Sequence, residues 1–303
     1  MAGARRRSLA SLLSLLTIGL TVIPVPAASA SRVLQSFHTG RFVLDLAIAE
    51  CHSSECPIEV RLRATSRVID RVTLPVAASS QRATAETTDT LWGADARHRA
   101  WATGEDNDYV STAAHLLRLA PQATALLVSQ RYGFEHTKRN HLMILPRAGK
   151  LHIIWKTEEG SGPTWSATQI IGGPDRQQIV FFHGFFDPDE DTAERLDAVR
   201  LDFDAASARL HESALPNRAT PLYLLNLGIH ETVAQGREAR STNANCLAPF
   251  WILDAGRFRA GAGGRAIVGS LYATRASAEA AARAAKSCLP GASASVETWT
   301  SAP

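Results

Sequence analysis

The sequence lacks the short motifs that would identify a catalytic centre. A strand-like run at 179–186 contains His183-Gly184, as α/β-hydrolases do after a strand, but no G-x-S-x-G segment follows it, which excludes that class of enzyme. No H-x-H or H-E-x-x-H spacing is present, so the histidines predict no metal centre. We therefore expect partly buried structural histidines at His136, His141, His152 and His183.

Runs of Lys or Arg are also absent after the first 30 residues. The chain has 32 basic and 29 acidic residues, and three of the basic ones, Arg5, Arg6 and Arg7, lie near the N-terminus. Without these three arginines the two signs balance. A phosphate backbone requires concentrated basic side chains, so we expect no nucleic-acid partner.

Long apolar runs are absent except at the N-terminus. Residues 9–23 are largely apolar, follow the three arginines and precede the small-residue site Ala28-Ser29-Ala30. This order is typical of a secretory signal peptide, predicted at 1–30. The run is short for a membrane span and no cysteine follows it, so we expect neither an anchor helix nor a lipoprotein. The mature chain is predicted to be secreted or periplasmic, with no transmembrane segment.

Cysteine is scarce, and its four copies in an exported chain favour disulfides. Of the three possible pairings we favour Cys51 with Cys56 and Cys246 with Cys288. The first pair would close a tight turn between strand-like runs at 42–49 and 57–64. A zinc site that adds His52 is an alternative, although it lacks the second pair of ligands that a structural site needs.

Alternating hydrophobicity predicts antiparallel strands through most of the first 215 residues. Strands are expected at 42–49, 57–64, 68–76, around the acidic turn at 104–108, and in a meander from 126 to 186. Residues 77–89 have no periodicity and predict a loop. Leu116, Leu117 and Leu119 break the alternation, so a short helix is predicted at 111–119. Val199, Leu201 and Phe203 predict one more strand, followed by a short helix or turn.

Two hairpin turns organise the meander, PRAGK at 146–150 and GGPDR at 172–176. Pairing across PRAGK places His141 opposite Trp155 and Met143 opposite Ile153. Pairing across GGPDR places Trp165 opposite His183 and Ala167 opposite Phe181. One core face is then predicted to contain His141, Met143, Leu145, Leu151, Ile153 and Trp155.

The proline-containing segment 214–221 predicts a linker, with a domain boundary near Pro216. Beyond it, strands are predicted at 222–228, 250–258, 266–274 and 294–299. The Ala-rich segment 275–287 predicts a helix, with Glu279 and Arg283 at the favourable four-residue spacing. The predicted fold class is α+β: a β-rich antiparallel domain, a meander or sandwich, at 31–215, and a small α+β domain at 216–303.

The C-terminal segment AIVGSLYATRASAEAAARAAKSCLPGASASVETW resembles the second half of a SPOR domain. It has a strand with Val-Gly, an Ala-rich helix that opens with Ala-Glu-Ala, and a strand that contains Val. The resemblance implies a ferredoxin-like fold and binding of denuded peptidoglycan glycan strands in the bacterial envelope. It covers only part of the small domain, and no binding residue is carried over. Residues 229–248 depart from the family, because Gly, Ser, Thr and Asn are common where its first helix should lie.

Antiparallel strands place alternate loops at opposite ends of a sheet. The long loops at 131–140, 156–163 and 184–194 should therefore gather at the end opposite PRAGK and GGPDR. They contain aromatic and charged side chains that suit a polar ligand such as a sugar. These candidates are Tyr132, Phe134, His136, Arg139, Glu158, Glu159, Trp165, His183, Asp187, Asp189 and Asp191. A charged, solvated loop edge is the alternative.

Several chemistries remain open for these loops. Glu158 and an aspartate of 187–191 could serve a secreted polysaccharide hydrolase. Asp187-x-Asp189-x-Asp191 begins like a calcium loop, but Thr192 and Ala198 replace the Gly and Glu that an EF-hand needs, so only an irregular calcium site is possible. Without a catalytic motif, the sequence predicts a non-enzymatic, exported envelope protein that binds an envelope component, such as peptidoglycan glycan. A structural interaction module is the third alternative.

Overall fold

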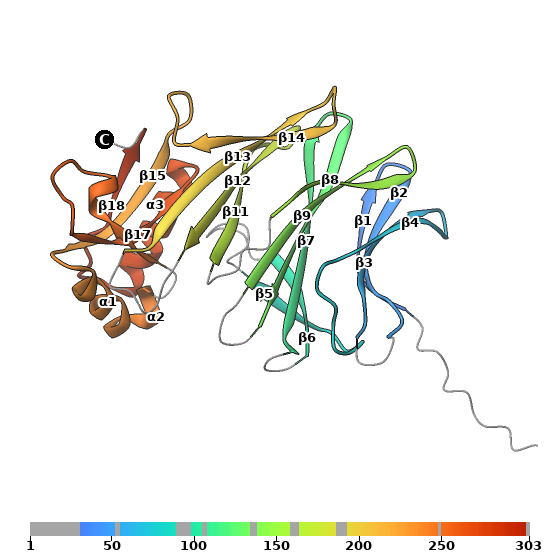
Figure 1. Cartoon of the computed structure of the whole chain (residues 1–303), viewed down its shortest axis with the longest axis horizontal. Helices are drawn as coiled ribbons and strands as arrows, with labels where there is room; N and C mark the ends of the chain where they lie inside the picture. The colour runs from blue at the N-terminus through green and yellow to red at the C-terminus, as the bar shows by residue number, and fades with distance from the viewer. Residues whose placement is uncertain are drawn as a thin grey trace, which may run out of the picture.

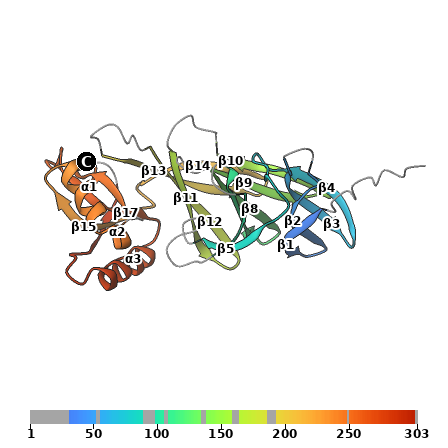
Figure 2. The ribbon, with the colours of Figure 1, turned by 90° about the horizontal axis from the view of Figure 1, so that it is seen from below.

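Four antiparallel sheets follow one another along the long axis of the molecule (Figures 1 and 2). This computed structural model describes residues 31–51, 55–88, 98–104, 108–133, 138–157, 164–185, 193–247 and 250–300. The predicted signal peptide, Phe134, His136, Glu158, Glu159 and the aspartates of 187–191 lie outside these ranges. The prediction of a strand-rich, antiparallel N-terminal part is confirmed.

The first three sheets are meanders in which each strand pairs with its neighbour in sequence. The first sheet contains β1 (Arg32–Thr39), β2 (Phe42–Ile48), β3 (Ile58–Ala64) and β4 (Arg67–Thr73). The central sheet contains β5 (Thr84–Thr88), β6 (His98–Thr103), β7 (Val110–Ala120), β8 (Ala123–Tyr132), β9 (Lys138–Arg147) and β10 (Lys150–Lys156). The third sheet contains β11 (Thr164–Gly173), β12 (Arg176–Phe185), β13 (Arg195–Asp204) and β14 (Arg209–Leu215).

Several element predictions are corrected by these boundaries. The meander from 126 to 186 is divided, because β10 and β11 belong to different sheets. The loop predicted at 77–89 includes β5, and the turn predicted after β13 leads into β14, which the alternation did not predict. Segment 250–258 contains the short strand β16 (Trp251–Asp254) and a 3-10 turn at Ala255–Arg257.

The central sheet is buried on both faces. Leu126 and Val128 of β8 pack against the first sheet, whereas Leu127 packs against the third. Because successive side chains of a strand point to opposite faces, a strand between two sheets is apolar at consecutive positions. The helix predicted at 111–119 is therefore wrong: Leu116 faces the first sheet and Leu117 the third, in strand β7.

Both predicted hairpin registers are wrong. The turns contain two residues each, so Arg147 pairs with Lys150 and Gly173 with Arg176, and every pair is shifted by one residue. A bulge between Ile153 and Trp155 adds a second shift, which pairs Met143 with Trp155. Ile153 is consequently 46% exposed and does not belong to the core.

The same shifts change the other predicted partners. Trp165 lies opposite Gly184, and Ser166 lies opposite His183. Ala167 pairs with Phe182 instead of Phe181. Leu151 packs with the first sheet and not with Met143 and Trp155, which face the third. His141, Met143, Leu145 and Trp155 are buried as predicted.

The C-terminal sheet has the strand order β16-β17-β15-β18 and is antiparallel throughout. Its remaining elements are β15 (Leu222–His230), α1 (Val233–Thr242), α2 (Ala244–Leu247), β17 (Ala266–Tyr272), α3 (Arg275–Cys288) and β18 (Ser295–Trp299). Helix α3 is the predicted Ala-rich helix, but its ion pair joins Arg275 to Glu279 and not Glu279 to Arg283.

Helix α1 forms in the segment whose composition departs from the SPOR pattern. Thr232 caps it by accepting a hydrogen bond from the Gln235 N–H. The buried Gly236 permits close packing, because a Cβ there would lie 3.3 Å from side-chain atoms of Ile252 and Ala266. The small residues of this segment thus allow a helix close to the sheet.

The face of the C-terminal sheet opposite the helices packs against the third sheet. Val180 and Phe182 of β12 share one apolar cluster with Leu224 and Trp251, so packing continues across the predicted boundary at Pro216. Gln169 of β11 adds polar contacts, accepting from the Ala273 N–H at 2.8 Å and donating to the Leu271 carbonyl at 3.4 Å. None of the helices that the structure describes is long and apolar enough to cross a membrane.

Candidate functional site

The predicted ligand residues lie on two different faces of the central sheet. Tyr132, at the end of β8, faces the first sheet. Arg139 shares the parity of His141 and Met143 in β9, which places it on the face toward the third sheet. His183, in β12, is exposed and stacks on Phe181 at 5.7 Å between ring centroids. Only the backbone position of Trp165 is described. The other candidates lie outside the described residues, so the structure describes the predicted rim only in part.

A cleft of about 500 Å³ lies beside Tyr132, between the first sheet and the central sheet. It is lined by Glu55, residues 75–79 and 108–110, Tyr132 and Gly133. The ring of Tyr132 is half-buried, and the carboxylates of Glu55 and Asp108 are exposed. An aromatic ring beside exposed carboxylates provides a flat apolar surface together with hydrogen-bond acceptors.

One wall of the cleft is fixed by the first disulfide. Cys51 and Cys56 are bonded, as the sequence favoured, which excludes the zinc alternative because both sulfurs are occupied. The Cys56 N–H donates to the Ala78 carbonyl at 2.7 Å, and the Ala78 N–H donates back at 2.9 Å. The disulfide therefore places Glu55 beside the segment that contains Ser79.

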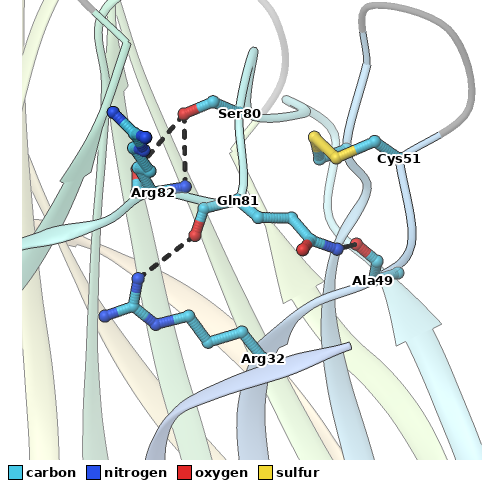
Figure 3. The surroundings of a disulfide bond; sticks show 7 residues. Arg32, Ala49, Cys51, Ser80, Gln81 and Arg82 are labelled. Carbon is cyan, nitrogen blue, oxygen red and sulfur yellow. Dashed lines mark hydrogen bonds between the residues drawn. A yellow bond between two sulfur atoms is a disulfide. The ribbon is translucent and has the colours of Figure 1, made fainter. Parts of the chain in front are cut away.

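The segment after this wall is tied to the first sheet. Figure 3 shows Gln81 donating from its side chain to the Ala49 carbonyl at 3.1 Å, while its own carbonyl accepts from Arg32 at 3.3 Å. The Ser80 hydroxyl donates to the Arg82 carbonyl and accepts from the Arg82 N–H. These contacts attach the end of the cleft wall to β1 and to the strand leading into the disulfide.

The opposite wall belongs to the central sheet. Gln130 holds the two walls together, because its amide donates to the Val76 carbonyl at 2.8 Å and accepts from the Val76 N–H at 3.1 Å. The backbone of Gly104 packs directly against the Asp108 carbonyl. A Cβ at position 104 would overlap that carbonyl, and the φ of +74° also favours glycine there. The cleft is thus bordered by backbone held at several points.

A polar network lies behind the cleft, on the face toward the third sheet. The Tyr109 hydroxyl donates to Glu86 at 2.9 Å, and the Ser111 hydroxyl donates to the same carboxylate. The Arg131 guanidinium lies 5.3 Å from the centroid of the Tyr109 ring. Burial raises the pKa of Tyr109, to which the Glu86 carboxylate contributes. The phenol is therefore neutral at physiological pH and can act as a donor.

Two arginines lie opposite each other on this same face. Arg131 of β8 pairs with Arg139 of β9, an arrangement that costs energy because like charges are cross-strand neighbours. Burial and then the Arg131 charge lower the pKa of Arg139 to about 10. The Arg139 guanidinium is still charged at neutral pH.

His141 is the buried neighbour of these arginines. It is fully buried and its Nδ1 is 2.6 Å from the Ser129 Oγ. Burial, followed by the Arg139 charge, lowers its pKa to about 3, so the ring is neutral. Its edge contacts Phe181 at 5.5 Å between centroids. His141 is consequently a structural histidine of the interface between the central and third sheets.

The cleft combines an aromatic ring with two exposed carboxylates. No group of three His, Cys, Asp or Glu side chains converges in the described part of the chain as metal ligands would. Glu55 and Asp108 are exposed to solvent at the cleft, where their carboxylates can accept hydrogen bonds. The cleft can therefore present a ring face and acceptors to a polyhydroxylated ligand.

The cleft residues Glu55 and Asp108 were not among the candidates predicted from the sequence. Each carries a local signal, since Glu55 lies within a disulfide-closed turn and Asp108 ends an acidic turn. Their approach to Tyr132 depends on packing between two sheets, which no local pattern encodes. Comparisons of the chain with protein-family models, with curated proteins and with solved structures find no match.

Proposed function

We propose that this protein is an exported, non-enzymatic envelope protein that binds an envelope glycan, of the peptidoglycan class, in the cleft beside Tyr132. The observation that carries the proposal is the meeting of Tyr132 with Glu55 and Asp108 in a cleft of about 500 Å³. A pocket of this volume can hold a ligand the size of a few sugar rings. An aromatic face can cover the apolar face of a sugar, and carboxylates accept hydrogen bonds from its hydroxyl groups.

The cysteine chemistry supports an oxidising compartment. All four cysteines are paired, Cys51 with Cys56 and Cys246 with Cys288. Disulfides persist in secreted and periplasmic proteins and are rare in reducing compartments. This agrees with export through the signal peptide predicted at 1–30.

The C-terminal unit supports an envelope role of the SPOR type. Its element order is β-α-β-β-α-β, and with β15, β16, β17 and β18 taken as strands one to four, the sheet order is 4-1-3-2. This order supports the ferredoxin-like arrangement that the SPOR resemblance implies. One face of this sheet packs against the third sheet. Glycan contacts of this unit would therefore involve its helices, loops or strand edges.

The test uses the full mature chain, because an isolated fragment 217–303 would expose the apolar face that contains Leu224 and Trp251. Purified peptidoglycan is incubated with the protein and sedimented. We expect the wild type to be enriched over a control protein, and Tyr132→Ala to weaken binding about tenfold, which corresponds to about 1.4 kcal/mol. Tyr132→Phe, which keeps the ring, should retain most of the binding.

Charge-matched variants separate the cleft from general electrostatics. Glu55→Gln removes an acceptor in the cleft, whereas Glu238→Gln removes an exposed carboxylate on α1. Only the first should reduce sedimentation. Wild-type protein that does not sediment above the control, or a folded Tyr132→Ala variant that binds like the wild type, contradicts the proposal. Release of reducing sugar by the wild type would favour the hydrolase alternative instead.

A further inference from the structure

The short hairpin turns of the first three sheets gather at the end opposite the Tyr132 cleft. These turns join β1 to β2, β3 to β4, β7 to β8, β9 to β10, β11 to β12, and β13 to β14. One cleft is bordered by turns from all three sheets, and a smaller neighbouring pocket joins the turns of β7–β8, β9–β10 and β13–β14. Asp70 of β4 accepts from the Leu151 N–H of β10 at 2.7 Å, which places the β3–β4 hairpin beside them.

This end of the molecule is strongly basic. Seven cationic side chains lie in or next to the six turns, and all are exposed: Arg41, Arg67, Arg118, Arg147, Lys150, Arg176 and Arg209. Two carboxylates, Asp175 and Asp204, lie in or next to the same turns, and a third, Asp70 of β4, lies close enough to Lys150 for their charges to interact. Arg118 is the one member of the seven with an ion pair to another described residue, at 3.5 Å from Asp175. Asp204 accepts hydrogen bonds from Ser207 within its own turn.

A cleft of about 650 Å³ opens at this basic end. Its lining includes His38 of β1, Arg41 from the β1–β2 turn, Arg118 from β7, and Pro174 from the β11–β12 turn. Among the described residues, no Asp or Glu lines it. The Arg41 guanidinium lies 4.8 Å from the centroid of the Phe42 ring, so the cation is held beside an apolar surface at the cleft.

The wall that carries Arg118 is anchored across two sheets. The Arg118 N–H donates to the Gln177 side chain of β12 at 2.9 Å. This contact connects the central sheet with the third sheet at the cleft. Two arginines from different sheets therefore face one concave space whose walls are joined by a hydrogen bond.

We propose that this basic cleft binds an anionic glycan, a polysaccharide that carries carboxylate or phosphate groups. The exposed cations attract an anionic polymer to the opening of the cleft. There Arg41 and Arg118 can form charge-assisted hydrogen bonds with its carboxylate or phosphate groups. The ring of Phe42 and the prolines provide apolar surfaces that suit the faces of sugar rings. The site is separate from the Tyr132 cleft, because it lies at the opposite ends of β7 and β8.

A membrane surface fits this end less well. The turn tips consist of Gly40-Arg41, Thr65-Ser66, Pro121-Gln122, Ala148-Gly149, Pro174-Asp175 and the Ala-Ala-Ser-Ala segment 205–208. These described tips include no large apolar side chain that would insert among lipid tails. The concave cleft also suits a polymer segment better than a flat bilayer.

Binding is measured at low salt by calorimetry with the full mature chain. The probes are polygalacturonate for carboxylates, a glycerol-phosphate polymer for phosphates, and neutral dextran. We expect one or both anionic polymers to bind and dextran not to bind, and the affinity to fall as salt screens the charges. The stronger of the two anionic probes identifies the group that the cleft prefers.

The double variant Arg41→Gln/Arg118→Gln should weaken binding of the anionic polymer at least tenfold. Arg283→Gln/Lys286→Gln, which removes the same charge from the exposed surface of α3, should leave it unchanged. Tyr132→Ala should also leave it unchanged, so failure of this inference is distinguishable from failure of the proposed function.

Several outcomes would overturn the inference. They are absence of binding to both anionic polymers, equal losses in the two double variants, and loss of binding in Tyr132→Ala. Tighter binding to duplex DNA or to phosphatidylglycerol vesicles than to either polymer would assign the basic end to a nucleic acid or a membrane instead.

Discussion

Glu194 provides a direct test of how the third sheet is attached to the C-terminal sheet. Its side chain is buried just before β13, and its carboxylate accepts from the Ile252 N–H at 2.6 Å and from Arg240 at 3.1 Å. Its own N–H donates to the Ile252 carbonyl at 2.7 Å. One residue thus joins the start of β13 to β16 and α1.

Replacing Glu194 with Ala removes both acceptors and leaves the backbone contact. The buried N–H of Ile252 then has no partner, which costs about 1–3 kcal/mol. Arg240 is partly exposed, so water replaces its lost carboxylate partner. Loss of the Arg240–Glu194 ion pair therefore adds only about 0.5–1 kcal/mol to the destabilisation. We expect Glu194→Ala to lower the free energy of unfolding by about 2–4 kcal/mol, or Tm by roughly 5–10 °C.

Glu194→Gln separates the hydrogen bond from the charge. The amide oxygen can still accept from Ile252, so this variant should lose less than about 1 kcal/mol at neutral pH. Burial raises the pKa of Glu194, although hydrogen bonds from Ile252 and Arg240 oppose the rise. A raised carboxyl pKa means that protonation favours the folded state.

The pH dependence follows from that sign. The contribution of Glu194 protonation is complete below the unfolded pKa of about 4.3 and is lost as pH rises through the raised folded pKa. The stability of the wild type relative to Glu194→Gln should therefore decrease over that window. Denaturant unfolding at several pH values measures it, with Glu238→Ala on the exposed face of α1 as control. If the free energy of unfolding of Glu194→Ala lies within about 0.5 kcal/mol of the wild-type value, the buried carboxylate does not stabilise the junction of the two sheets.

Three further predictions concern stability. Cys246→Ala/Cys288→Ala removes a disulfide that spans 42 residues, and the chain-entropy model predicts a loss of about 4 kcal/mol in denaturant unfolding; an unchanged midpoint contradicts it. The pKa of His141 is lowered to about 3, so its contribution to stability is full above about pH 6.5 and decreases toward pH 3, by at most about 1.4 kcal/mol per pH unit. An NMR titration of His141 with a midpoint near pH 6.5 would show instead that its ring is not buried in the folded protein. Gly269→Ala would make a Cβ overlap the Leu225 carbonyl, so we expect a loss of about 3 kcal/mol or more, and an unchanged Tm would disprove the close approach.

The elements that were predicted correctly depend on local chemistry. The Ala-rich segment forms α3, both favoured disulfides are present, and PRAGK and GGPDR form hairpins. Helix propensity and turn composition depend on a few neighbouring residues. Four cysteines allow only three disulfide pairings, so a choice among them is possible from the sequence. The errors arose where a strand is buried on both faces, as in β7, because apolar residues then occur at consecutive positions.

The register errors have an equally specific cause. A two-residue turn at Ala148-Gly149, with φ angles of 52° and 76°, shifts the pairing by one residue relative to a three-residue turn. The bulge near Trp155 shifts it again. These shifts decide that Ile153 is exposed, and alternation alone cannot detect them, since both registers preserve the period of two.

The amino-acid sequence predicted the strand-rich character and the C-terminal helix and favoured the cysteine pairing that is observed, because these features depend on residues close in the chain or on few alternatives. Which loops share a surface depends instead on how the sheets pack against one another. That packing brings Glu55 and Tyr132 to one cleft between two sheets. It also gathers cations from six separate turns at one end of the molecule, where Arg41 and Arg118 line a second cleft. The sequence contains no run of basic residues that would predict the basic end, because each turn contributes only one or two positive charges. Stacking of the sheets, driven by burial of their apolar faces, brings those charges together.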